Sequence, residues 1–277
     1  LLNAGIPAAT DPATIRIYGN GGAEPPLDES VPVADDLVEN AVSVRDAGTI
    51  GVLDASDEIV FYGRSTRGWV YNPSTRLFLH VLNRFSDANV YWLTYGGVAK
   101  TMVGEPSASD PAYDAATVGG KVFRDDEKIN LLNSGLQWLG QVFAVGDQLT
   151  LVHPLPGLDA TAAIRYRLHL GAQSSASSSF NVYEHGAAIG AIGLLSTLVG
   201  EYNATQLRDG ILDRSVVPSF TDAQSQLKLA YNSGSALGRG FLDWIEIFYR
   251  RRLVASGDEF RFHTDDSSSA ARYAIGG

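Results

Sequence analysis

The chain has 277 residues, enough for about two domains at a usual size of roughly 150 residues each. Hydrophobic residues make up 45% and charged residues 19%, the balance of a folded globular protein rather than a disordered one. The net charge of -10 disfavours binding to nucleic acid, and the absence of cysteine excludes disulfides, thiolate nucleophiles and zinc–thiolate sites.

The first part of the chain is predicted to form short β-strands. Residues 15–18 alternate between apolar and polar side chains and stop at the glycine-rich turn 19–22. Helix signals are limited to short pieces such as residues 34–40. Strands 77–82 and 89–95 are expected to pair as a hairpin across a polar loop. Further strand patterns lie at residues 41–44, 58–63 and 68–72.

Residues 104–118 are rich in Ala, Ser, Asp and Pro and lack periodicity, which marks a domain boundary. We therefore predict an N-terminal β domain at residues 1–118 and a jelly-roll-like β-sandwich domain at residues 119–277. The fold class is all-β, with two β-sandwich or jelly-roll-like blocks and a few short helices. No apolar stretch approaches the ~20 residues that cross a bilayer.

Two patterns in the predicted second domain indicate particular strands and turns. Residues 163–170 alternate strictly, so Arg165, Arg167 and His169 should share one face of a strand. Residues 180–183 and 188–190 are predicted to form a hairpin that turns at Glu184-His185-Gly186. We interpret this His-Gly pair as a turn and not as a catalytic pair, because no nucleophile accompanies it.

No catalytic, cofactor or metal motif is present. The chain lacks a nucleophile elbow, a phosphate-binding loop and a zinc-protease signature, and the five histidines never fall at ligand spacing. The acidic pairs at residues 35–36, 125–126 and 265–266 are interpreted as solvated surface rather than calcium ligands. We therefore predict no catalytic residue, no cofactor and no metal, and no enzymatic activity of this chain by itself.

One aromatic set is a candidate ligand site. Trp69 and Tyr71 should project from one strand face, close to Arg67. Sugar rings often stack on such aromatic side chains, although aromatic pairs in β-sandwiches more often belong to the core.

Several segments, taken in order, resemble the gingipain-type cysteine peptidase family. They are residues 15–22 (IRIYGNGG), 57–63 (DEIVFYG), 78–80 (FLH), 133–140 (NSGLQWLG) and 242–245 (LDWI). Within that family the chain is most similar to the surface sortase of type IX secretion. The resemblance spans nearly the whole chain but covers only the β region ahead of the family's caspase-like peptidase domain, so no catalytic residue carries over.

The resemblance implies a non-catalytic, N-terminal scaffold that positions the downstream peptidase domain or presents it to secreted protein substrates. It also implies an extracellular location on a bacterial cell surface, associated with the outer membrane. The chain begins at Leu1 without a signal peptide, and we expect a targeting segment and a downstream domain to lie outside it. The alternative function is a carbohydrate-binding, galactose-binding-like module with a glycan as its partner.

Overall fold

The computed structural model describes residues 1–104, 110–133, 135–197, 206–255, 260, 262–263 and 271–276. The chain divides into two compact units, Leu1–Ser107 and Ala108–Gly277. The all-β prediction is confirmed: the described residues contain only two single-turn 3-10 helices, η1 (Leu2–Ala4) and η2 (Pro12–Thr14), beside the strands. No helix among these residues has the length and apolar character needed to cross a membrane.

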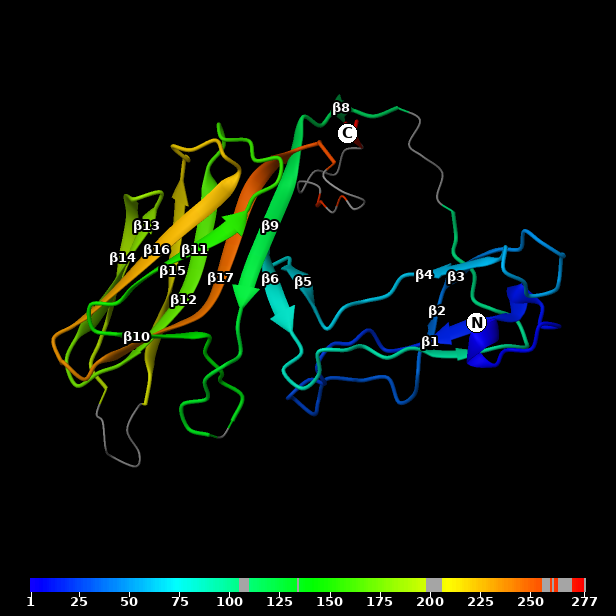
Figure 1. The fold of residues 1–277 in the computed structure, drawn as a ribbon, viewed down its shortest axis with the longest axis horizontal. Helices are drawn as coiled ribbons and strands as arrows, with labels where there is room; N and C mark the ends of the chain where they lie inside the picture. Colours follow the sequence, from blue (N-terminus) through cyan, green and yellow to red (C-terminus); the bar gives the residue numbers. More distant parts are fainter. Residues whose placement is uncertain are drawn as a thin grey trace. The chain divides into compact units, whose positions relative to one another are not determined.

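The first unit is built from short antiparallel strands around small apolar clusters. One cluster joins Ile6, Ile15 and Leu53, and another joins Ile17, Val42 and Ala99. A three-stranded sheet has the order β2-β1-β7 (Figure 1), and two further strand pairs form separate two-stranded sheets. The strands are β1 (Arg16–Tyr18), β2 (Glu39–Asn40), β3 (Val42–Arg45), β4 (Glu58–Phe61), β5 (Arg67–Asn72), β6 (Leu77–Leu82) and β7 (Trp92–Thr94), and β3 pairs with β4 and β5 with β6.

Two local predictions for this unit are wrong. The segment 77–82 pairs with β5, and the segment expected to pair with it contributes β7 to β1 instead. The cause is the turn after β5, where the Asn72 side-chain oxygen accepts hydrogen bonds from the backbone N–H groups of Ser74 (3.0 Å) and Thr75 (3.2 Å). That turn folds the chain back at once. The segment 34–40 is not helical, and its end forms β2.

The second unit is a β-sandwich. One sheet has the order β10-β17-β12-β15, with β9 also paired to β17, and the other has the order β11-β16-β13-β14. All pairings in these sheets are antiparallel. The strands are β9 (Thr117–Asp125), β10 (Gln141–Ala144), β11 (Gln148–Pro154), β12 (Ile164–Gln173), β13 (Ser178–Glu184), β14 (Ala187–Leu194), β15 (Arg208–Val216), β16 (Gln224–Ser233) and β17 (Arg239–Arg252).

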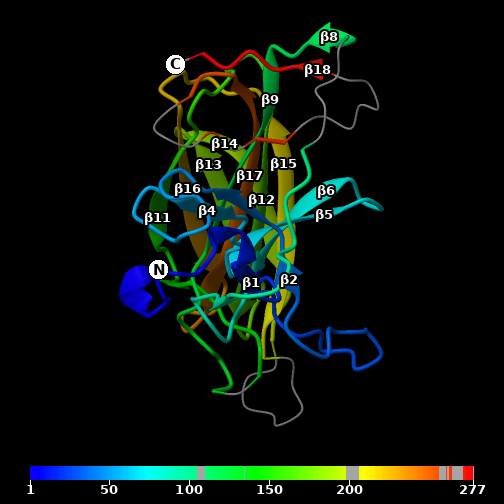
Figure 2. The same ribbon diagram turned by 90° about the vertical axis from the view of Figure 1, so that its right-hand side faces the viewer.

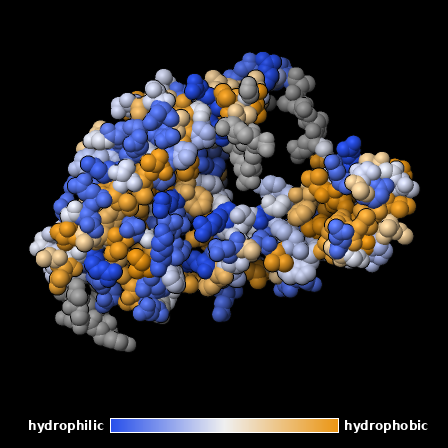
Figure 3. All heavy atoms as spheres, in the orientation of Figure 1, coloured by the Kyte–Doolittle hydropathy of each residue, from blue (hydrophilic) through white to orange (hydrophobic). Residues whose placement is uncertain are grey.

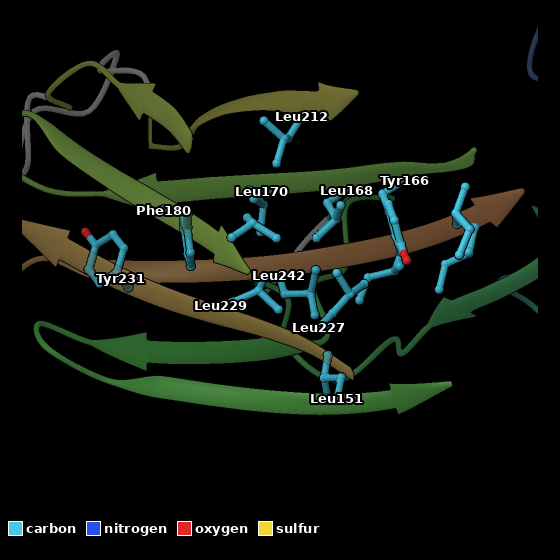
Figure 4. Close-up of a cluster of buried hydrophobic side chains, with 14 of the residues drawn as sticks. Leu151, Tyr166, Leu168, Leu170, Phe180, Leu212, Leu227, Leu229, Tyr231 and Leu242 are labelled. Carbon is cyan, nitrogen blue, oxygen red and sulfur yellow. The ribbon is translucent and has the colours of Figure 1, made fainter. Parts of the chain in front are cut away.

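The core lies between these two sheets. Figure 4 shows Tyr166 and Leu168 of β12 and Phe180 and Leu227 of the facing sheet pointing into the same space, and all four are fully buried. Side chains that alternate along the strands produce this layer, because about every second one faces inward. Each such side chain contributes about 1.5–3 kcal/mol on burial. The second unit therefore has a large continuous core, in contrast to the first.

The boundary between the units falls earlier in the chain than residue 118. β8 (Tyr113–Asp114) pairs in parallel with β18 (Ala271–Arg272) of the second unit (Figure 2). An ion pair reinforces this ladder, since the Arg272 guanidinium donates to both Asp114 carboxylate oxygens at 2.6 and 2.7 Å. The segment that directly precedes β9 thus belongs to the second unit.

Candidate functional site

The predicted ligand-binding residues lie on one face of the β5–β6 hairpin. Arg67, Trp69 and Tyr71 alternate along β5 and therefore point to the same side. Trp69 is opposite His80, with ring centroids 6.3 Å apart and nearly perpendicular planes, and Tyr71 is opposite Phe78 at 5.1 Å. Both predicted aromatic residues are half-buried and Arg67 is exposed. Cross-strand aromatic pairs of this kind stabilise a hairpin, and ligand binding on this face stays a prediction.

The predicted polar face of β12 carries an ion-pair network on the outer side of its sheet. The Arg165 guanidinium donates two hydrogen bonds to the Asp213 carboxylate, at 2.8 and 2.7 Å. This pairing lowers the pKa of Asp213. Arg167 is buried, pairs with the buried Glu246 carboxylate and lies 3.5 Å from Asp213. The two arginines thereby tie β12 to both of its neighbours, β15 and β17.

His169 extends this network. Its Nδ1 lies 2.6 Å from the Asp243 carboxylate and its Nε2 lies 2.8 Å from that of Asp209. The ring stacks on Trp244 with centroids 5.5 Å apart, and the Arg167 guanidinium lies 5.5 Å from the same indole. Burial lowers the pKa of His169, but the two carboxylates outweigh it, so the pKa stands above its ordinary value.

Each cationic side chain on this face pairs with one or two carboxylates, which gives the face the character of a stabilising network. The alternation along residues 163–170 predicts the three cationic members of this network but none of their acidic partners. Those partners follow 40 to 79 residues later in the chain. Only the strand register brings them together.

A serine, a glutamate and a histidine approach one another at the end of β13, which raises the question of a catalytic triad. The Ser225 hydroxyl donates to the Glu184 carboxylate at 2.7 Å, and the Gln226 backbone N–H donates to the same carboxylate at 2.7 Å. Ser225 is fully buried and pairs with the carboxylate, not with the His185 imidazole. The turn prediction is confirmed, since His185 and Gly186 have φ values of 47° and 81°. The cluster is therefore structural.

His153 is a buried titratable group on β11. It is 5% exposed, and within the described residues neither ring nitrogen has a hydrogen-bond partner. Burial, together with the positive charge of Arg124, lowers its pKa to about 4. The ring is therefore neutral at pH 7 and packs as part of the interior.

The residues that the structure describes show no evidence of a metal site. They contain no group of three or more histidine, aspartate or glutamate side chains arranged to hold a metal ion. The acidic pair 265–266 lies outside the described residues. The chain has no cysteine, so the nucleophile of a cysteine peptidase is absent from its sequence.

The first unit exposes much apolar surface. Most of the exposed large hydrophobic side chains lie in this unit, although it is the smaller of the two. Figure 3 shows apolar residues in orange gathered over it. The densest run is the segment 92–98, where Trp92 (51% exposed), Leu93, Tyr95 and Val98 (89% exposed) follow one another closely. Four exposed apolar side chains within seven residues make this segment a candidate contact surface.

One solved structure shares the fold along the whole chain. It is dimeric latent PorU from Porphyromonas gingivalis, which superposes with a TM-score of 0.78 and 18% sequence identity over 99% of this chain. The chain spans 25% of the length of that PorU chain. A carbohydrate-binding module of type CBM36 in complex with calcium and xylotriose, and a CBM35 from Cellvibrio japonicus, each cover 46% of this chain with TM-scores of 0.29 and 0.27 and identities of 12% and 15%. TM-scores this low carry no argument about this chain. Neither a protein-family model nor a curated protein sequence matches it.

Proposed function

We propose that this chain is the non-catalytic N-terminal β region of a gingipain-type sorting peptidase of type IX secretion. The fold match with PorU carries the proposal, because it extends over 99% of this chain but only a quarter of the other. The ordered sequence segments point to the same family member. A location on the bacterial cell surface, associated with the outer membrane, follows from this assignment.

In this proposal the chain acts as a scaffold for the peptidase domain. The apolar segment 92–98 supplies the contact, since a side chain such as Val98, 89% exposed, gains about 1.5–3 kcal/mol when it is buried by a partner. The remaining partners are the secreted protein substrates that the peptidase domain receives. The net charge of -10 disfavours nucleic acid as a partner, because a polyanion would be repelled.

The test uses the full gene product and compares two surface variants. Val98→Asp places a charge in the 92–98 segment, and Leu237→Asp places the same charge at an equally exposed residue of the second unit (90% exposed). After the connection to the peptidase domain is cut, the wild type and Leu237→Asp should stay associated in size-exclusion chromatography, whereas Val98→Asp should separate.

Three outcomes would overturn the proposal. The wild-type pieces could separate by themselves, Val98→Asp could remain as firmly associated as Leu237→Asp, or the gene could encode no peptidase domain with a cysteine nucleophile. Thermal unfolding of the uncut variants provides the control for folding, because substitutions at exposed positions usually change stability by less than about 0.5 kcal/mol.

A further inference from the structure

The connection between β9 and β10 forms a loop with a fixed base. Ile129 and Leu139 form an antiparallel bridge in which each backbone N–H donates to the other residue's carbonyl oxygen, at 2.9 and 2.8 Å. Leu139 is buried, with 1% of its surface exposed. Because neighbouring side chains of an extended segment point to opposite sides, the adjacent Trp138 faces outward, and it is 39% exposed.

This loop borders an open surface pocket of about 570 Å³. That volume lies within the range of roughly 300–1,000 Å³ that is usual for small-molecule sites. An indole ring, aliphatic carbon and amide groups together line it, which offers one apolar face and several hydrogen-bonding groups. The lining residues are Lys128, Ile129, Asn130, Asn133, Gly135 and Trp138.

The shape of the pocket is set by hydrogen bonds within the loop. The Asn130 side chain donates to the Gly135 carbonyl oxygen at 3.2 Å and accepts from the Leu132 backbone N–H at 3.2 Å. Asn133 and Gly135 adopt φ values of 51° and 82°, a left-handed conformation that asparagine and glycine tolerate best. Asn133 is exposed and lies at the rim of the pocket.

One charged side chain, that of Lys128, belongs to the lining of the pocket. The Lys128 ammonium lies 3.1 Å from the Asp126 carboxylate, which also accepts hydrogen bonds from Arg124 at 3.1 and 2.7 Å. The acidic side chain therefore already engages the lysine. A ligand with hydroxyl groups and an apolar ring face matches the indole, aliphatic and amide groups of the lining.

We propose that this pocket binds a neutral pyranose unit of a glycan. The ring stacks on the indole of Trp138, since aromatic side chains combine a large apolar face with a polar edge. The Asn133 amide hydrogen-bonds the hydroxyl groups, and so do the N–H groups of the Lys128 ammonium that its pairing with Asp126 leaves over. This inference adds a binding activity to the scaffold and does not depend on the scaffold proposal. Its site lies in the second unit, away in sequence from the predicted residues of β5.

The experiment titrates the purified chain with neutral oligosaccharides and follows tryptophan fluorescence and calorimetric heat. The panel consists of cellotetraose, xylotetraose, mannotetraose and β-1,4-galactotetraose, each to about 10 mM, the concentration needed for a millimolar dissociation constant. At least one should bind. Trp138→Ala should weaken binding at least about tenfold, which corresponds to about 1.4 kcal/mol of lost contact.

Two further variants separate binding from folding. Asn133→Gly keeps the left-handed backbone and removes only the amide, so it should weaken binding while the melting temperature stays unchanged. Gln137→Ala, at an exposed neighbour that does not line the pocket, should bind like the wild type. The inference is overturned if no oligosaccharide of the panel binds, or if both Trp138→Ala and Asn133→Gly bind as tightly as Gln137→Ala.

Discussion

Acidification from pH 7.5 to pH 5 should destabilise the wild-type chain more than a His153→Leu variant. His153 is buried, and its pKa is about 4 in the folded chain against an ordinary value of 6.5. The unfolded state therefore binds the proton first as the pH falls. The stability that comes from the neutral ring is complete above pH 6.5 and is lost as the pH falls toward 4.

The size of this effect follows from the two pKa values. Proton linkage gives a loss of about 2 kcal/mol for this single group between pH 7.5 and pH 5. For a unit of this size the loss corresponds to a shift of roughly 4–8 °C in melting temperature. Urea denaturation at both pH values measures it, and the quantity compared is the change in unfolding free energy with pH, not its value at one pH.

The variant isolates His153 from the other titrating groups. His169 has a raised pKa, so its contribution is present below pH 6.5 and is lost as the pH rises through its folded pKa, the opposite direction. It titrates identically in the wild type and in His153→Leu, as do the carboxylates. Equal losses of stability in the two proteins would refute the reasoning, because the ring would then be free to take up a proton in the folded state.

Three other outcomes are expected. Gly240→Ala should destabilise the second unit by about 1–3 kcal/mol in urea denaturation, since its Cβ would lie within 2.6 Å of two buried aromatic rings, whereas Gly193→Ala, with nothing within 4 Å, should not. Glu184→Ala should cost about 3 kcal/mol, because the Ser225 hydroxyl and the Gln226 N–H lose their acceptor, and a thermal melt that matches the wild type would contradict this. Added KCl should raise the melting temperature, because 31 acidic residues face 21 basic ones and ions screen their repulsion; a flat or falling curve would mean that the charges are already paired.

Elements that are determined by a few neighbouring residues could be predicted from the sequence. The hairpin of β13 and β14 was predictable because Glu184, His185 and Gly186 separate two strand patterns and tolerate the turn conformation. The alternation of β12 likewise placed Arg165, Arg167 and His169 on one face. The pairing of β5 with β6 was missed although its signal was also local. It lay in the side chain of Asn72, which closes the turn and so decides which strand comes next.

Long-range features were not predictable, because one chain does not reveal which strands become neighbours. The contact of Arg167 with Glu246 joins residues 79 positions apart and depends on the register between β12 and β17. The burial of side chains could not be predicted either. The same alternation that put Trp69 and Tyr71 on one face of β5 does not tell whether that face meets solvent, and the structure has both half-buried.

The two units differ in the size of their apolar cores and in how much apolar surface they expose. This difference is relevant to function. The second unit closes a large core between two sheets, and its outer charges are paired across β12, β15 and β17. The first unit has only small apolar clusters and leaves residues such as Trp92 and Val98 in solvent. A free-standing binding module would gain nothing from that exposure, which costs solubility and leaves apolar area unburied. The proposed scaffold would account for this exposure, because another domain would cover the apolar surface. The proposed glycan pocket, in contrast, lies on the second unit, whose core is large and closed.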